Sequence, residues 1–298
     1  MVTSMRELYD RARTGTPRPI AVACAHDEDV LLSLDRAVRE GLVQPLLVGR
    51  RAEIEAIRER RGLSIPTSGV IDCPGDVEAC EIAVRKVSTG EARMLMKGLV
   101  STSTFLRAIL NKEWGLRSRP LLSHVAAFEG HDPDRLILLT DVAMNIAPDL
   151  AQKVQILENA VDLAHRLGVA RPKVVAIAAV ETVNADMPAT LDAAVLSKMA
   201  DRGQIKGCVV DGPLALDNAL SAEAARHKGI TSPVAGCADL LLMPNIEAGN
   251  VLYKAISQLT TIAMAAVIVG ASAPVVLTSR ADSDETKFNS IALAAAIS

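Results

Sequence analysis

The chain has 298 residues, a formal net charge of −3 at pH 7, and a composition that is 50% hydrophobic but only 2% aromatic. This length suffices for two domains or one large one with an ample core, which must be built from aliphatic side chains. The charge and the lack of a dense Lys/Arg block argue against nucleic acid or an anionic membrane as partner.

Cysteine usage and hydropathy indicate a cytoplasmic protein. The five cysteines form no CxxC pair and have no histidine at metal-ligand spacing, so we expect reduced, mostly buried thiols and no metal. They are Cys24, Cys73, Cys80, Cys208 and Cys237. No apolar signal core follows Met1, and Gly270 and Pro274 interrupt the most apolar stretch, residues 259–277. We therefore expect no membrane-spanning segment.

The first hundred residues alternate between strand and helix patterns after a short amphipathic helix over 5–13. Strands are predicted over 20–25, 45–48, 69–72 and 94–96, and helices over 27–40, 52–61, 76–87 and 105–113. Such alternation with short connections predicts a parallel sheet covered by helices.

A glycine and a run of hydroxyls follow the fourth predicted strand. The hydroxyl run is Ser101, Thr102, Ser103 and Thr104. It stands where a helix N-cap is wanted, so capping is one interpretation. The other is an anion site, because Lys97 and Gly98 add a cation and a close-approach glycine beside free N–H groups. The segment is not a P-loop, since GxxxxGK[ST] is absent.

Two consecutive apolar runs, 121–128 and 135–140, break the alternation, and the polar turn between them favours a hairpin. We take this hairpin as the crossing between two α/β domains. One comprises residues 1–130 plus 271–298, and the other comprises residues 131–270. His124 is expected to be a hydrogen-bonded core histidine. Asp141 and Asn145 follow the second run as candidate ligand contacts, with turn formation as the alternative.

Strand–helix alternation then resumes. Helices are predicted over 149–167, 187–199, 217–227 and 247–259, and strands over 173–179, 207–210 and 239–243. Polar residues stand at several of these strand ends, among them Glu247 and Asn250. Together they favour a ligand cleft at the carboxyl edge of the sheet, although each also has a capping explanation.

The last apolar run, residues 274–278, predicts a short buried strand followed by a helix from Ser283. Ser279 and Arg280 lie between them, where an open α/β sheet usually places its ligand site. Arg280 and the helix start suit a phosphate. The alternative is a solvated arginine and a capped helix, with Asp282 and Glu285 as a capping box.

The absence of several known catalytic motifs limits the types of reaction that the sequence supports. The sequence contains no GxSxG, no HExxH, no GxGxxG after the first strand and no kinase signature. No Cys–His pair or metal cluster favours a covalent or metal mechanism. A phosphate-competent cleft with Ser, Thr, Arg, Lys and spare carboxylates fits direct group transfer between two substrates.

Five separated motifs then carry a resemblance. They are KGLVST (97–102), TDVAMNIAP (140–148), VDGPLALDN (210–218), PNIEAGN (244–250) and LTSRADS (277–283). On these motifs the chain resembles the phosphate acetyltransferase / phosphate butyryltransferase family over nearly its whole length, and least over the first 90 residues. Residues 198–204 and 210–218 look closer to the butyryltransferase branch.

The resemblance implies the reaction acyl-CoA + phosphate ⇌ acyl phosphate + CoA, most simply on butyryl or another short acyl chain, with acetyl-CoA as the alternative. It implies two α/β/α domains with mostly parallel sheets, related to the isocitrate and isopropylmalate dehydrogenases, and an interdomain cleft. Coenzyme A thioester and inorganic phosphate are the expected substrates, without a permanently bound cofactor. A homo-oligomer, dimer or higher, is also expected.

The family's catalytic Ser-Arg pair matches Ser279 and Arg280. The place of its catalytic aspartate falls at Glu285 or Thr286, so the general base stays open among Asp282, Asp284 and Glu285. The residues expected to bind phosphate or CoA are Lys97, Ser101, Thr102, Ser103, Thr104, Asp141, Asn145, Glu247, Asn250 and Ser283. Where acetyltransferases often have a cysteine after the aspartate matching Asp141, this chain has Val142.

Two rival classes of protein fit the sequence less well. A β-decarboxylating dehydrogenase on the same fold needs a metal-binding aspartate cluster and a run of substrate arginines on one helix, and the sequence has neither. A non-catalytic binding domain has no need of Ser279, Arg280 and the hydroxyl run.

Overall fold

The computed structural model describes residues 1–130, 135–278 and 282–298. It divides into two compact units. The first unit contains Met5–Pro120 and Ala263–Ser298, and the second contains Met1–Ser4 and Leu121–Ile262. The domains suggested by the sequence change at 130/131 and 270/271, whereas these units change at 4/5, 120/121 and 262/263.

The strands of the first unit form a sheet in the order β3-β2-β1-β4-β11-β10. All neighbouring pairs are parallel except β10 and β11. The strands are β1 (Arg18–Ala23), β2 (Val43–Gly49), β3 (Val70–Asp72), β4 (Met94–Lys97), β10 (Met264–Val269) and β11 (Val275–Val276). The parallel sheet predicted for the amino-terminal segment is thus confirmed, and a strand pair from the carboxyl-terminal segment extends it.

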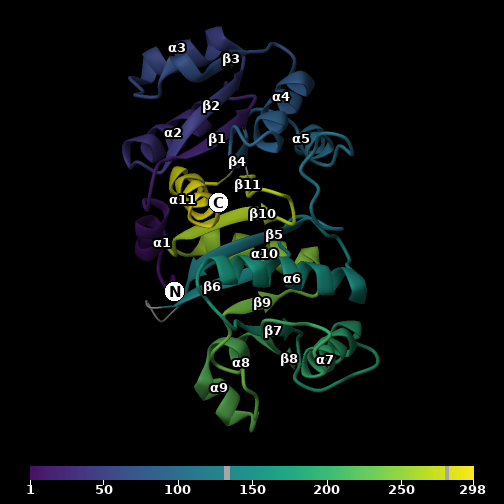
Figure 1. Cartoon of the computed structure of the whole chain (residues 1–298). Helices are drawn as coiled ribbons and strands as arrows, with labels where there is room; N and C mark the ends of the chain where they lie inside the picture. Colours follow the sequence, from purple (N-terminus) through teal and green to yellow (C-terminus); the bar gives the residue numbers. More distant parts are fainter. Residues whose placement is uncertain (131–134, 279–281) are drawn as a thin grey trace. The chain divides into compact units, whose positions relative to one another are not determined.

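Helices alternate with these strands along the chain, as predicted (Figure 1). They are α1 (Met5–Ala12), α2 (Glu28–Arg39), α3 (Arg51–Arg61), α4 (Asp76–Ser88), α5 (Thr102–Ile109) and α11 (Asp284–Ile297), with a 3₁₀ turn, η1, at Thr67–Gly69. The helix predicted over 105–113 begins earlier because Ser101 caps it. It also ends earlier, since the Asn111 side chain accepts from the backbone of Glu113 and Trp114 and forms a turn.

Helix α11 is the buried helix of the first unit. Every side chain from Thr286 to Ile297 is buried, as expected for a helix that is apolar on all sides. It packs on β10, α1 and α2, and α1 lies beside it in Figure 1. The Tyr9 hydroxyl donates to Asn289 Oδ1 (2.6 Å), and the Tyr9 ring lies 5.4 Å from the ring of Phe288.

The strands of the second unit follow the order β5-β6-β9-β7-β8. β5 and β6 are antiparallel, with Glu129 opposite Leu136, and the other pairs are parallel. The hairpin predicted here is confirmed, although its turn at 131–134 lies outside the described residues. The strands are β5 (Ser123–Glu129), β6 (Leu136–Thr140), β7 (Lys173–Ile177), β8 (Val209–Leu214) and β9 (Leu240–Leu242).

The helices of the second unit match the prediction with one exception. They are α6 (Leu150–Arg166), α7 (Pro188–Asp201), α8 (Leu216–Leu220), α9 (Ala222–His227) and α10 (Ile246–Leu259). The single helix predicted over 217–227 is wrong, because the chain is extended at Ser221. The Ser221 hydroxyl accepts from the N–H of Ala224 and starts a new helix instead.

Candidate functional site

Three parallel strands of the first unit end side by side. β1 pairs with β4, with Ala23 opposite Lys97, and β4 pairs with β11, with Met96 opposite Val276. The chain after β11 therefore leaves the sheet beside Lys97 (Figure 1). The carboxyl ends of parallel strands are where open α/β sheets bind ligands. The structure thus brings the predicted 97–104 segment and the start of the 277–283 motif to one edge.

Gly98 lets the chain pass the end of β1. A Cβ atom at this position would lie 2.2 Å from the Cys24 carbonyl oxygen. The N–H groups of Gly98 and Leu99 donate to the carbonyls of Ala23 and Cys24, both at 2.8 Å. The neighbouring strand therefore uses these two N–H groups, so the predicted anion site depends on the N–H groups at the start of α5. Lys97 Nζ donates to the carbonyls of Gly98 (3.1 Å) and Val100 (3.0 Å), so it also shapes this loop.

The hydroxyl run caps α5 and also faces solvent. Ser101 Oγ accepts from the N–H of Thr104 (3.1 Å) and lies 3.0 Å from Ser103 Oγ and 2.9 Å from Thr104 Oγ1. The capping interpretation is confirmed for Ser101. Ser101, Thr102 and Ser103 are exposed at the helix N-terminus, where an anion is favoured. Anion binding by these residues stays a prediction.

The predicted catalytic pair, Ser279 and Arg280, lies outside the described residues. Next to it, Ser283 caps α11, because its Oγ accepts from the N–H of Thr286 (3.1 Å). The capping box expected of Asp282 and Glu285 is therefore wrong: the helix begins one residue later. Glu285 instead forms an ion pair with Arg36 of α2, whose guanidinium lies 3.8 Å from the Phe288 ring centroid.

Lys287 was missed by the sequence reasoning. It is only 4% exposed, and its Nζ donates to the Asp282 carbonyl (2.8 Å) and to Asp29 Oδ2 (3.3 Å). The segment that carries the candidate carboxylates is thereby bonded to the first turn of α2. A lysine inside an otherwise apolar helix was the available signal, since a buried ammonium needs partners. Asp284 is exposed and Asp282 is half-exposed.

In the second unit, Asp141 organises the loop after β6. Its carboxylate, 3% exposed, accepts from the N–H groups of Ala143 (2.8 Å) and Met144 (2.9 Å) and from Asn145 Nδ2 (2.5 Å). Asn145 Nδ2 also donates to the Leu122 carbonyl (3.0 Å). Turn formation, the alternative interpretation of these residues, is confirmed, and ligand contact stays a prediction.

The start of α10 packs directly on that loop. A Cβ atom on Gly249 would lie 2.1 Å from the Asp141 carbonyl oxygen, and Asn250 Nδ2 donates to the Val142 carbonyl (2.9 Å). Asn245 caps the helix by accepting from the N–H of Ala248 (3.0 Å). Asn250 thus positions the helix, whereas Glu247 is exposed in the first turn.

Two of the buried thiols, Cys24 and Cys208, are not poised as nucleophiles. A hydrogen bond with Cys80, together with burial, raises the pKa of the Cys24 thiol far above its usual range. Burial raises the pKa of Cys208 to about 11. Within residues 1–130, 135–278 and 282–298, no three His, Cys, Asp or Glu side chains are grouped to hold a metal ion. No helix in those ranges is long and apolar enough to cross a membrane.

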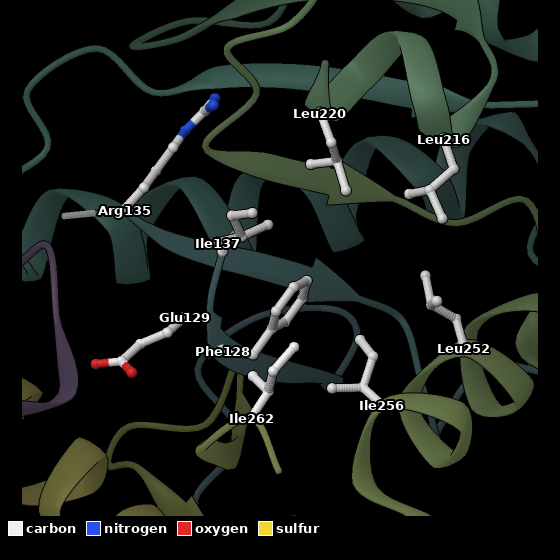
Figure 2. Close-up of a pocket in the computed structure, with 10 residues that line it drawn as sticks. Phe128, Glu129, Arg135, Ile137, Leu216, Leu220, Leu252, Ile256 and Ile262 are labelled. Atoms are coloured by element: carbon white, nitrogen blue, oxygen red, sulfur yellow. The ribbon is translucent and has the colours of Figure 1, made fainter. Parts of the chain in front are cut away.

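An apolar pocket of about 270 Å³ lies elsewhere in the second unit (Figure 2). Its wall includes Phe128 at the end of β5 and Ile137 near the start of β6, and the Glu129 and Arg135 side chains point away from it. At about 3.3 Å per residue, Ile137 lies about 13 Å from Asp141 along the strand. The wall of the pocket at Ile137 therefore lies away from Asp141. The apolar side chains that line it are Phe128, Ile137, Leu216, Leu220, Leu252, Ile256 and Ile262.

Solved structures share this fold. A branched-chain phosphotransacylase from Enterococcus faecalis V583 is 34% identical, with a TM-score of 0.81 over 93% of this chain and 97% of that chain. A 4-hydroxythreonine-4-phosphate dehydrogenase from Klebsiella pneumoniae is similar in fold alone, with a TM-score of 0.57 at 13% identity over 96% and 100% of the two chains. The predicted α/β class with mostly parallel sheets is confirmed, and the likeness to a dehydrogenase is one of fold alone. The molecule is an α/β enzyme of the phosphotransacylase class.

Sequence comparison defines the family. The family model described as phosphate acetyl/butaryl transferase matches residues 76–295. A phosphate butyryltransferase of Clostridium acetobutylicum is 53% identical over 297 residues, covering 100% of this chain and 99% of the relative. A phosphate acetyltransferase of Thermotoga maritima is 47% identical over 291 residues, covering 98% of each. The chain belongs to the phosphate acetyl/butaryl transferase family, as its five motifs predicted.

Proposed function

We propose that this enzyme catalyses acyl-CoA + phosphate ⇌ acyl phosphate + CoA, with butyryl or another short acyl chain as the preferred group. The observation that carries the proposal is the common exit of the chain after β4 and β11. The segment that leads to the hydroxyl run of α5 follows β4, and the segment that leads to the Ser-Arg motif follows the neighbouring strand β11. The 53% identity to a phosphate butyryltransferase supports the choice of acyl group.

The proposed reaction is direct transfer in a ternary complex. In the direction that makes acyl-CoA, a carboxylate takes the proton of the CoA thiol, because the thiolate is the effective nucleophile. The thiolate then attacks the acyl carbonyl. A C–S bond forms, the C–O bond to phosphate breaks, and phosphate leaves with the electron pair. We assign the developing oxyanion to Ser279 and the departing phosphate to Arg280.

Of the three candidate bases, Asp282 and Asp284 are favoured over Glu285. The Glu285 carboxylate is already paired with Arg36 of α2, which holds its side chain against that helix. Asp284 is exposed at the first residue of α11, and the backbone of Asp282 is fixed by Lys287.

Substrate binding is proposed for both units. From the first unit, Lys97, Ser101, Thr102, Ser103, Thr104 and Ser283 would contact phosphate groups of the substrates, and from the second, Asp141, Asn145, Glu247 and Asn250 would contribute. Exposed hydroxyls at a helix N-terminus support the first assignment. The bonds that Asp141 and Asn250 make to the loop after β6 support a positioning role for these two.

The test is release of the CoA thiol from butyryl-CoA, followed with a thiol reagent. We expect release that depends on added inorganic phosphate, and a loss of about 10²–10³ in kcat for Arg280→Ala, as for removal of a transition-state donor. Arg202→Ala, an exposed arginine after α7, is the matched control and should keep wild-type rates. Phosphate-independent release would contradict the reaction, and full activity of Arg280→Ala would remove Arg280 from it.

Acetyl transfer is the second candidate, favoured by the 47% identity to a phosphate acetyltransferase. A methylene in an apolar pocket is worth only about 1–3 kcal/mol of discrimination. Initial rates on acetyl-, propionyl-, butyryl- and branched acyl-CoA decide between the two. We expect kcat/KM to be at least about tenfold higher for butyryl-CoA than for acetyl-CoA, and the reverse order would favour the acetyl assignment.

We further propose a cytoplasmic location and a homo-oligomer. All five cysteines are free thiols, which supports a reducing compartment.

A further inference from the structure

A lysine and a cysteine meet at the amino-terminal ends of two strands in the second unit. Lys173 is the first residue of β7, and Cys237 comes shortly before β9, the neighbouring parallel strand (Figure 1). Lys173 Nζ donates a hydrogen bond to Cys237 Sγ (3.1 Å), and both residues are half-buried. The edge proposed for substrates is formed by the carboxyl ends of these strands, so the pair lies at the opposite end.

Hydrogen bonds on both sides hold the loop that carries Cys237. The Arg135 guanidinium donates to the carbonyls of the two residues that flank this cysteine, at 3.2 and 2.7 Å. The Asp239 N–H donates to the Lys173 carbonyl, and Asp239 Oδ2 accepts from the Lys173 N–H, both at 2.8 Å. The backbones of the cysteine and the lysine are therefore fixed to each other, and this keeps the sulfur beside the ammonium.

Cys237 differs from the other four cysteines in its exposure. Those four are buried, whereas Cys237 is half-buried. The thiolate is the form of cysteine that attacks a peroxide, and the hydrogen bond from the Lys173 ammonium is placed to hold that negative charge. Cys237 is therefore the thiol of this chain that a peroxide in solution reaches most readily.

We propose that Cys237 and Lys173 form a reversible oxidation site, at which hydrogen peroxide couples the cysteine sulfur to the lysine nitrogen. The Cys237 thiolate attacks one peroxide oxygen and the O–O bond breaks. The Lys173 ammonium gives a proton to the departing hydroxide, which leaves as water. The sulfur is now a sulfenic acid, oxidised by two electrons. The neutral amine then attacks the sulfur, an S–N bond forms, and the hydroxyl leaves with an amine proton as a second water.

The link protects the thiol from irreversible damage. A sulfenic acid that meets more peroxide is oxidised to sulfinic and sulfonic acids, which reductants in the cell do not generally reverse. The S–N link removes the sulfenic acid before that step. Two molecules of an added thiol reopen the link: they are oxidised to a disulfide, and the cysteine and the lysine are restored.

The test is treatment of the full-length protein with hydrogen peroxide, followed by digestion with a protease that does not cut at lysine and by mass analysis of the peptides. In the wild type we expect the peptides that carry Lys173 and Cys237 to be recovered as one linked species, about 2 Da lighter than their sum, because two hydrogens are lost. A thiol reductant added before digestion should return the two separate peptides with a free thiol. The four buried cysteines should stay unmodified.

Three variants separate the roles of the two residues. Cys237→Ser should give no linked species. Lys173→Arg keeps the positive charge but removes the amine, so Cys237 should advance to the sulfinic acid, about 32 Da heavier, and the reductant should recover at least about tenfold less free thiol than in the wild type. Lys198→Arg changes an exposed lysine on α7, and this matched control should behave as the wild type. Thermal unfolding checks that each variant is folded.

Three outcomes would overturn the proposal. The first is a Cys237 thiol that survives peroxide in the wild type. The second is a sulfinic acid formed in equal yield in the wild type and in Lys173→Arg. The third is a linked species that retains an oxygen atom, about 14 Da heavier than the sum of its peptides, since the S–N bond would then be absent.

Discussion

Lys287 connects the most apolar helix of the chain to the segment that carries the proposed base. Its buried ammonium bonds to the Asp282 carbonyl and to Asp29 on α2. Arg36 of the same helix pairs with Glu285. Lys287 thus fixes the backbone before Ser283, and Arg36 holds the side chain of Glu285, whereas the Asp284 carboxylate is exposed.

We expect Asp282→Asn and Asp284→Asn to differ sharply. The variant that removes the general base should lose about 10²–10⁴ in kcat, because an amide cannot take the thiol proton. Glu285→Gln should lose less than about tenfold, since its carboxylate serves the ion pair with Arg36. The measurement is kcat with butyryl-CoA and phosphate. A large loss in Glu285→Gln alone would move the base to that residue.

His26 is a buried imidazole at the end of β1. It is 4% exposed, and neither ring nitrogen has a hydrogen-bond partner among the described residues. Burial, reinforced by the charge of Arg50, lowers the pKa of His26 below its ordinary value of 6.5. The folded protein therefore keeps this ring neutral at a pH where the unfolded chain already binds a proton.

This shift predicts a pH dependence of stability. Below about pH 6.5 the unfolded state binds more protons at His26 than the folded state, so the free energy of unfolding falls as the pH falls. Above that pH the contribution is fully present. His26→Gln should flatten this part of the profile, measured by urea unfolding between pH 5.5 and 7.5. An unchanged slope in the variant would show that other groups cause it.

At the scale of the element, the N-terminus of α5 serves two purposes in our account. Ser101 caps the helix, whereas Ser103 is exposed and contacts only the Ser101 hydroxyl among the hydrogen bonds described for it. Capping and ligand binding can therefore be separated by mutation.

We expect Ser101→Ala to lower the free energy of unfolding by about 1 kcal/mol, the usual cost of a lost N-cap, and Ser103→Ala to change it by less than about 0.5 kcal/mol. If the hydroxyls bind substrate phosphate, KM for phosphate or CoA should rise in both variants. A KM unchanged in Ser103→Ala would leave the segment with capping alone. Ser221→Ala, which removes the cap of α9, is the matched control for cap loss away from this edge.

At the scale of the whole molecule, the alternation of strands and helices could be predicted because apolar periodicity is a local signal. What the sequence did not reveal depends on partners far along the chain. The N–H groups of Gly98 and Leu99, which follow β4, bond to the end of β1, more than 70 residues earlier. Asp282 and Glu285 have the spacing of a capping box, but Glu285 pairs with Arg36, 249 residues earlier. The local pattern of the sequence carries no information about contacts with residues so far away in the chain.

For the candidate site, the residues could be predicted from the sequence, but their placement in the fold could not. The motifs identified the Ser-Arg pair and the hydroxyl run, because family resemblance is carried by residue identity. Their placement at one edge follows from the sheet order, in which β11 returns from the far end of the sequence to lie beside β4. Nothing in the local composition of either segment encodes that neighbour.

The return of β10, β11 and α11 to the first unit has a consequence for biosynthesis. A ribosome that has translated residues 1–262 has delivered every segment of the second unit, whereas the first unit still lacks two strands and its buried helix. Until residues 263–298 emerge, one edge of β4 has no strand to pair with, and the apolar side chains that α11 will cover remain exposed to solvent. The nascent chain therefore passes through a stage in which the second unit is fully translated while the first unit still exposes apolar surface. At this stage the chain is most prone to aggregation and benefits most from a chaperone.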